Sequence, residues 1–393
     1  MPGRVADALY DAGVRHERSG KLAAALSAYR EALQADPTHL FAAINLGGLF
    51  AETGELTGAE QVYRAGLEHH PRSADLLNGL GYIYLTLGRD DAAKTCLEQA
   101  VSVAPELLQA RLNLASLFLK TNRTARAHAQ AKLATVQHPG SAQAWTRLGE
   151  TERAAGHVEA AHAAFAQAAA LAPDDMYIRL LLSTTHPALR QALIGKTVVL
   201  RRHAVEDAAF IQSCYDDTEF SHLVNLNWPT SLSGESIAAT IAHTAREQDY
   251  LKGQLEWVIH RRTATGLEPI GLAALIEPWS GNRSAEFLLG IKQPQTGAYR
   301  PAVEASLLLL DLAFDKLGLE RLNSFCYLHN RKALENTLAL GFTQEGILRN
   351  YIYDHRGQAF LSVYLSSMLA ADYRNNPRLK KLASKRLPAQ PLL

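Results

Sequence analysis

The sequence predicts an all-α solenoid followed by an α+β domain with a central mixed, mostly antiparallel sheet. Two observations support this prediction. Up to residue 173, the same residue types recur every 34 positions, as in proteins built from stacked helical repeats. From residue 195 onward this recurrence stops, and segments with alternating apolar residues predict strands between helices. Two domains are also the expected number for a chain of 393 residues.

Five prolines set the period of the N-terminal part. They stand 34 residues apart, at Pro37, Pro71, Pro105, Pro139 and Pro173. The expected turn inside each repeat carries a residue that adopts a positive φ at little cost. These residues are Gly20, Gly54, Gly88, Asn122 and Gly156. The pattern resembles the tetratricopeptide repeat, and it predicts five repeats at 6–39, 40–73, 74–107, 108–141 and 142–175.

This resemblance also sets the expected domain limits. We expect the repeats over residues 6–175, a capping helix and linker over 176–194, and the second domain over 195–370. The remaining residues, 371–393, contain many Lys and Arg residues and few acids. We expect them to form a disordered basic tail.

Asparagines recur at a position that faces the concave groove in tetratricopeptide repeats. Asn45 and Asn113 occupy it, Asn78 stands one place out of phase, and Arg147 occupies it in the last repeat. A column of Asn side chains resembles repeat proteins that hold an extended peptide through its backbone. The groove is therefore expected to bind a protein or peptide partner. Two alternatives stay open: these Asn side chains solvate the helix face, or the repeats serve to form a homodimer.

The second domain shows a predicted order of strands and helices, β, α, α, β, β, β, α, β, α, β, β, over about 175 residues. Three stretches, at residues 285–289, 303–305 and 341–349, add a sequence signature. Together they resemble the GNAT acetyltransferases, within the branch that acts on ribosomal-protein N-termini and amino sugars. The resemblance implies an N-acetyltransferase that takes acetyl-CoA as donor substrate and needs no metal. Its acceptor would be an amine on a protein held by the repeats, or an amino sugar.

The resemblance also implies which residues hold the donor. Backbone N–H groups of a loop and a helix N-terminus would bind the pyrophosphate. The residues matched to donor binding are Gly297, Ala298, Tyr299, Arg300 and Ala302, with Leu288 and Leu289 on the preceding strand and Asn330 after the next one. Arg300 stands where the family has a glycine. The alternative is therefore a scaffold protein whose acetyltransferase domain has little or no turnover.

Two residues are the catalytic candidates. A protonated amine must lose a proton before it attacks, and Glu286 matches the family position of the general base. The family's usual tyrosine acid is replaced by Thr337, whose hydroxyl is a poor acid. Tyr351 is the candidate for that role, with water or His329 as alternatives.

Composition excludes several other classes. The net charge is +1, which argues against specific nucleic-acid binding, and no apolar run is long enough to predict a membrane helix. Cys96, Cys214 and Cys326 lie far apart, which argues against disulfides and a zinc site. We expect a cytoplasmic protein.

Overall fold

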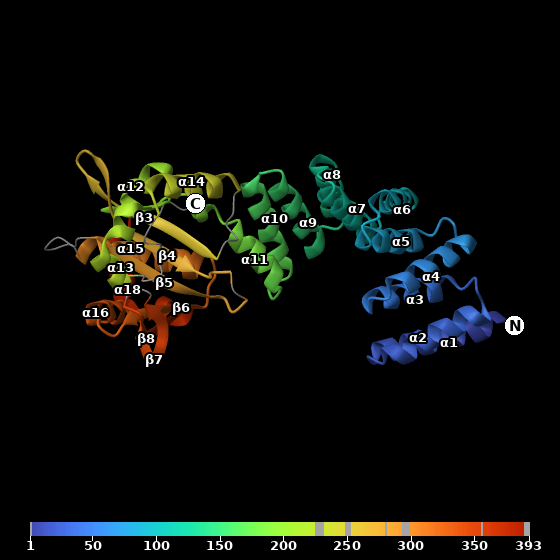
Figure 1. Ribbon diagram of the computed structural model, residues 1–393. Helices are drawn as coiled ribbons and strands as arrows, with labels where there is room; N and C mark the ends of the chain where they lie inside the picture. The colour runs from blue at the N-terminus through green and yellow to red at the C-terminus, as the bar shows by residue number, and fades with distance from the viewer. Residues whose placement is uncertain are drawn as a thin grey trace. The chain divides into compact units, whose positions relative to one another are not determined.

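The computed structural model describes residues 2–224, 232–247, 253–279, 281–292, 299–354 and 357–388. The chain divides into two compact units, Met1–Arg179 and Leu180–Leu393. Figure 1 shows that the first is helical and that the second contains a sheet with helices. The division lies within the segment 176–194 that was expected to be cap and linker, and the finer domain limits stay predictions.

The first unit is an array of helix pairs, as predicted. One pair falls in each 34-residue repeat of the described chain. The pairs are α1 (Pro2–Arg18) and α2 (Leu22–Ala35), α3 (Leu40–Glu52) and α4 (Leu56–His69), α5 (Ala74–Thr86) and α6 (Asp90–Val103), α7 (Leu108–Lys120) and α8 (Thr124–Gln137), α9 (Ala142–Ala154) and α10 (Val158–Leu171). A further helix, α11 (Met176–Thr184), follows. Consecutive helices pack against one another, and the turn residue Asn122 has φ 56°, as its position required.

A glycine on the first helix of a repeat receives a large ring from the second. A Cβ built on Gly47 would lie 2.4 Å from the Tyr63 ring, so no larger residue fits there without displacing the ring. Gly13 meets Tyr29, and Gly149 meets Phe165, in the same way. In the third repeat Gly81 meets Leu97 instead of a ring, and the fourth repeat has Ala115 and Ala131 at these two positions. The small residue thus makes room for a side chain of its own repeat.

The second unit is built on an eight-stranded sheet in the order β1-β2-β3-β4-β5-β6-β8-β7. Neighbours are antiparallel except β5 and β6. The strands are β1 (Leu193–Ile194), β2 (Val198–Arg202), β3 (Gln254–Thr263), β4 (Gly266–Ile276), β5 (Ser284–Ile291), β6 (Arg321–Tyr327), β7 (Thr343–Asp354) and β8 (Ala359–Leu369). This confirms the predicted mixed, mostly antiparallel sheet.

Helices cover both faces of this sheet. Between β2 and β3 lie α12 (Ala208–Asp216), α13 (Thr218–Val224) and α14 (Gly234–Glu247), whereas the sequence predicted two helices there. The added helix α13 forms because the Asp217 side chain accepts a hydrogen bond from the Phe220 backbone N–H (2.9 Å), and Phe220 is buried. After β5 come α15 (Tyr299–Asp311), continued by a π-helical turn at Leu312–Lys316, and, after β6, α16 (Arg331–Ala339).

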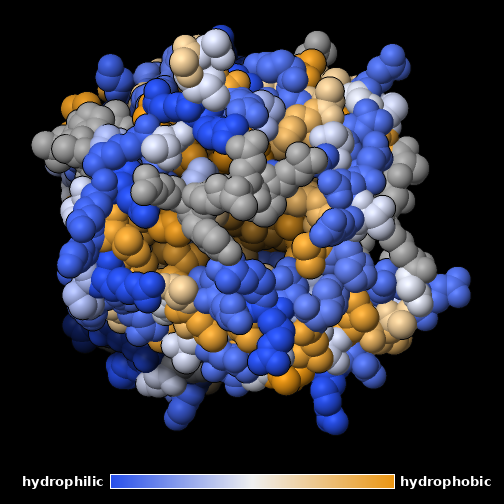
Figure 2. Space-filling model, turned by 90° about the vertical axis from the view of Figure 1, so that its left-hand side faces the viewer, coloured by the Kyte–Doolittle hydropathy of each residue, from blue (hydrophilic) through white to orange (hydrophobic). Residues whose placement is uncertain are grey.

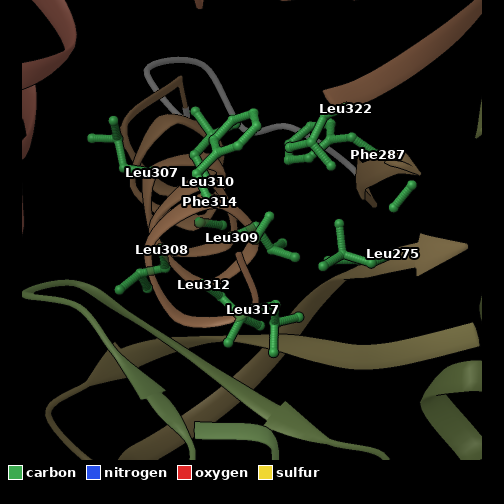
Figure 3. Packing of buried hydrophobic residues seen from close by; sticks show 14 of the residues in the cluster. Leu275, Phe287, Leu307, Leu308, Leu309, Leu310, Leu312, Phe314, Leu317 and Leu322 are labelled. Carbon is green, nitrogen blue, oxygen red and sulfur yellow. The ribbon is translucent and has the colours of Figure 1, made fainter. Parts of the chain in front are cut away.

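Leucines of α15 form the centre of the core. Figure 3 shows Leu309 and Leu312 of this helix and its continuation near Leu275, Phe287 and Leu322 of three strands. The helix is buried on several sides, because the C-terminal segment also packs against it. On the opposite face of the sheet, α12, α13 and α14 pack in a separate cluster around β3 and β4.

The expectation of a disordered tail from residue 371 was wrong for residues up to 386. The chain there forms α17 (Ala370–Asn375) and α18 (Pro377–Arg386). Asn376 caps α18 by accepting hydrogen bonds from the backbone N–H groups of Arg378 and Leu379. Leu379 is buried in the core, so a few apolar residues among the basic ones are enough to dock the helix. In the described parts of the chain, none of the helices combines the length and apolarity of a membrane span.

Candidate active site

The strands β5 and β6 separate soon after they meet. Their parallel pairing covers Ser284 with Arg321, Ala285 with Leu322 and Glu286 with Asn323. β5 then continues to Ile291 and β6 to Tyr327, with no further pairing between them in the described residues. Backbone N–H and C=O groups of strands that part in this way are available to an extended ligand. Glu286 stands at the last pair, where the two strands begin to diverge.

Alternation along β5 divides its side chains between two faces. Ala285 and Phe287 belong to the core beneath α15, so Glu286 and Leu288 lie on the other face. Leu288 is buried, and Leu289 packs partly against the core. The two leucines expected to line the donor therefore point to opposite faces, and the backbone between Leu288 and Leu289 is what borders the gap.

The carboxyl group of Glu286 is half-buried and has an unusual acidity. Burial raises its pKa from 4.5 to about 7, and the neighbouring charge of Glu277 adds to the rise. No described residue donates a hydrogen bond that would favour its charged form. A group with a pKa near neutrality accepts and releases protons readily at pH 7, as a general base must. The catalytic role of Glu286 stays a prediction.

A polar pocket lies beside Glu286 on the same face. Its lining includes His203, Tyr215, Gln254, Glu256 and Leu288. The register places it there, because Leu288 is two residues beyond Glu286 on β5 and pairs with β4, which in turn pairs with the strand of Glu256. Figure 2 shows one face of the C-terminal unit, on which apolar residues are visible between hydrophilic ones. Sequence reasoning missed the pocket residues, although the alternation in β3 could have placed Glu256 on this face.

Two groups of this pocket have shifted acidities. Burial lowers the pKa of His203, although the Glu256 carboxylate lies 3.7 Å from its Nδ1 and opposes the shift. Burial also raises the pKa of the Tyr215 hydroxyl. Near neutral pH the imidazole of His203 and the phenol of Tyr215 are therefore uncharged, and Glu256 brings the pocket a carboxylate.

Asn330 caps α16 and also contacts α13. Its Oδ1 accepts a hydrogen bond from Ala333 N–H (3.0 Å), and its Nδ2 donates to the carbonyl oxygen of Leu223 (3.0 Å). Both ends of the side chain are therefore engaged within the protein. A contact between Asn330 and the coenzyme stays a prediction, and it requires the bond to Leu223 to open or the coenzyme to share the amide.

Tyr351 lies on β7, in the irregular stretch between Leu348 and Ile352 where its register with β8 shifts. It is 52% exposed and stacks on Phe325, with ring centroids 5.3 Å apart. Phe325 follows Asn323 by two residues on β6, so it lies on the same face as Glu286. Tyr351 thus lies on the same face as Glu286, and its role as the acid stays a prediction. Thr337, which replaces the family's tyrosine acid, has its hydroxyl 3.7 Å from the thiol of Cys326.

The predicted donor loop lies mostly outside the described residues. Gly297 and Ala298 are not among them. Tyr299 and Arg300 begin α15, and Ala302 belongs to its first turn. The first turn of a helix carries backbone N–H groups without intrahelical partners, so this end of α15 is able to bind an anion. The loop's own role stays a prediction.

The groove asparagines bond mainly to one another and to neighbouring tyrosines. Asn45 Nδ2 donates to the hydroxyl of Tyr29 (3.2 Å), and Asn113 Nδ2 donates to Asn78 Oδ1 (2.9 Å). Asn113 is buried. The amide of Asn78, one place out of phase in sequence, thus meets that of Asn113 in space.

Arg147, the fourth predicted groove residue, is paired as well. Its guanidinium forms an ion pair with Glu150 one helical turn further on (2.6 Å). The polar groups predicted to hold a peptide therefore already have partners within the repeats, and peptide binding by them stays a prediction.

Family models match both units of the chain. A GNAT acetyltransferase domain model matches residues 197–343, and tetratricopeptide repeat models match residues 18–74, 74–107 and 112–176. A curated relative, the "uncharacterized N-acetyltransferase YoaA" of Bacillus subtilis (strain 168), is 27% identical over 168 residues, which are 42% of this chain and 91% of YoaA.

Solved structures resemble each unit separately. A spermidine N-acetyltransferase from Vibrio cholerae, in complex with CoA and spermine, has 22% identity and a TM-score of 0.39, covering 46% of this chain and 99% of its own. A thermophilic tetratricopeptide repeat protein of Thermus thermophilus has 21% identity and a TM-score of 0.41, covering 46% of this chain and 98% of its own. Likeness at this level concerns the fold alone.

Proposed function

We propose that this chain, with tetratricopeptide repeats over residues 18–176 and a GNAT acetyltransferase domain over residues 197–343, is an enzyme. It transfers an acetyl group from acetyl-CoA to a primary amine. The observation that carries the proposal is the half-buried carboxyl group of Glu286, with a pKa of about 7, at the point where β5 and β6 part. A base of this acidity suits an acceptor that must lose a proton before it attacks.

The donor occupies the gap between the two strands in this proposal. Its pantetheine arm pairs with the free backbone edge of β5 at Leu288 and Leu289, and its pyrophosphate meets the N-terminus of α15. There the backbone N–H groups of Tyr299, Arg300 and Ala302, with the preceding Gly297 and Ala298, face the negative charge. Asn330 contributes from the β6 side.

The chemistry follows from this placement. The acceptor amine gives a proton to Glu286, directly or through a water molecule, and its nitrogen attacks the thioester carbonyl carbon. The carbon–sulfur bond then breaks, and the thiolate of CoA leaves. The hydroxyl of Tyr351 gives the thiolate its proton. The phenolate of Tyr351 then recovers a proton from the acetylated nitrogen, which must lose its second proton to become an amide, and Glu286 releases its own proton to solvent. The polar pocket with Glu256 and Tyr215 lies on the acceptor side.

The acceptor proposed here is an amine of a protein that the repeats bind. Since the groove asparagines are already hydrogen-bonded, an exposed aromatic side chain of the repeats is the proposed contact instead. Phe41 on α3 is 60% exposed, and its ring lies 6.2 Å from that of Tyr10 on α1. Such rings supply contact area at small entropic cost. An amino sugar, the alternative acceptor, would react without help from the repeats.

The test measures donor binding and thiol release with the full chain. Calorimetry should give a micromolar Kd for acetyl-CoA, equivalent to about −8 kcal/mol. Thiol release should then depend on an added primary amine, in a panel of peptides with free N-termini or lysines and of amino sugars. Phe41→Ala should raise the Michaelis constant for a protein acceptor and leave that for a free amine unchanged. No binding of acetyl-CoA at millimolar concentration would contradict the proposal and favour a scaffold protein without turnover.

A further inference from the structure

A second carboxylate of this unit is buried on the other side of the sheet. Glu304, in the second turn of α15, is 1% exposed. A buried carboxylate is costly unless hydrogen bonds compensate for the water it has lost. Glu304 Oε1 accepts from the backbone N–H of Thr197 (2.8 Å) and, at longer range, of Val198 (3.4 Å). Its Oε2 accepts from the Thr197 hydroxyl (2.7 Å).

The three donors belong to one tight turn that leads into β2. Gly195 N–H donates to the Val198 carbonyl (2.8 Å), which closes the turn around the carboxylate. A Cβ built on Gly195 would lie 2.1 Å from Glu304 Oε1, so a side chain there would displace the carboxylate. The next residue, Lys196, donates from Nζ to the Lys385 carbonyl of α18 (2.7 Å). The 195–198 turn is thus shaped to hold Glu304, and it also contacts the helix that covers α15.

The hydrogen bonds of Glu304 connect α15 to the sheet near the N-terminus of this helix, which is the end proposed to bind acetyl-CoA. Glu304 follows the first residue of α15 by five positions, a rise of about 7.5 Å along the helix axis. β2 is hydrogen-bonded into the sheet through β3. The bonds from Thr197 and Val198 therefore restrain both the rotation and the axial position of the first turns of α15 relative to the sheet that carries Glu286.

We propose that Glu304 is a positioning residue for the acetyl donor. It fixes the N-terminus of α15 so that the backbone N–H groups of its first turn hold the pyrophosphate of CoA at the correct distance from the strand gap. The inference rests on the proposed function, in which this helix end binds the donor. A displacement of these N–H groups would lengthen their hydrogen bonds to the pyrophosphate, so the donor would be held less tightly.

The test compares three variants of the full chain at residues of the same region. Glu304→Ala removes all three bonds, and we expect the Kd for CoA to rise roughly tenfold or more while the turnover at saturating donor changes less than about threefold. Glu304→Gln should restore binding, because an amide oxygen accepts from the two backbone N–H groups and the amide NH₂ donates to the Thr197 hydroxyl. Ser306→Ala is the matched control, since this buried serine donates to a carbonyl of its own helix, that of Ala302 (2.9 Å).

If Glu304→Ala does not fold, a fourth variant tests whether the hydrogen bonds of Glu304 support CoA binding. Thr197→Val keeps the shape and removes one donor, and it should weaken CoA binding more than Ser306→Ala does. Wild-type protein that binds CoA, together with Glu304→Ala or Thr197→Val protein that binds it as tightly as the Ser306→Ala control, would overturn the inference and leave the proposed function standing. Wild-type protein that does not bind CoA would overturn both.

Discussion

The two faces of the C-terminal sheet treat a carboxylate in opposite ways. On the face beneath α15, Glu304 is fully buried and accepts three hydrogen bonds from the turn that begins β2. On the other face, Glu286 is half-buried beside another carboxylate, and its pKa is raised to about 7. Burial alone therefore does not predict the chemistry of a carboxyl group. The donors around it decide whether it is a structural anchor or a group that exchanges protons.

The largest expected effect is on turnover, which should depend on the carboxyl group of Glu286 and not on that of Glu304. Glu286→Gln keeps the shape of the side chain and removes the base, so turnover should fall about 10²–10⁴-fold while the Kd for acetyl-CoA stays the same. Steady-state kinetics with calorimetry on the same protein measure both quantities. Glu304→Gln is the matched control, with turnover near that of the wild type. A loss smaller than threefold for Glu286→Gln across the pH range would give the role of base to another group.

The second prediction concerns stability. Glu304→Ala leaves the backbone N–H groups of Thr197 and Val198 without their acceptor, and each buried unsatisfied group costs about 1–3 kcal/mol. Urea unfolding of the full chain, followed at the transition of the C-terminal unit, should show this loss. Glu286→Ala removes a desolvated carboxyl group that no described residue bonds, so it should destabilise much less. Equal losses of unfolding free energy for Glu304→Ala and Glu286→Ala would contradict the proposed difference between the two carboxyl groups.

The third prediction uses the sign of the pKa shift. Glu286 has a folded pKa of about 7, above the 4.5 of the unfolded chain. The native state therefore holds a proton that the unfolded state has lost, and wild-type stability should fall as the pH rises from 4.5 to 7. Glu286→Gln lacks this dependence, so its melting temperature should exceed that of the wild type more at pH 8 than at pH 4. A difference that stays constant with pH would show that the carboxyl group is not perturbed.

The smallest expected effect comes from Glu277. Its charge contributes to the raised pKa of Glu286, after burial. Glu277→Gln should move the midpoint of the pH profile of kcat/KM to lower pH, by less than about one unit. Activity below the midpoint should rise, since more of Glu286 is then deprotonated. A midpoint that moves upward would mean that Glu277 acts through structure and not through its charge.

The repeats could be predicted well from the sequence, because each of them uses the same positions for the same contacts. The constant spacing of the prolines, and of Gly47 and its equivalents, indicates stacked helix pairs. The hydrogen bond between Asn78 and Asn113 could not be predicted, since the two residues stand 35 positions apart and out of phase.

For the C-terminal unit, the order of strands and helices could be predicted from the sequence, but most contacts between side chains could not. Glu286 was placed by a strand and its signature, whereas His203 and Glu256 reach the pocket through the register of strands that are distant in sequence. Glu304 stood inside a stretch that marked the family resemblance, and only the contacts of Thr197 revealed what it does. Short helices such as α13 and α18 depend on a capping side chain and a few buried residues, which composition does not reveal.

The docking of α18 has a consequence for the order in which the protein forms. The repeats contact mainly their sequence neighbours, so each pair is able to fold soon after it leaves the ribosome. The core around α15 needs Leu379 and Leu382 of α18, which are made about 80 residues after α15 begins. During that interval the side chains of α18 that complete the core around α15 are missing, and transiently exposed apolar surface of this kind favours aggregation.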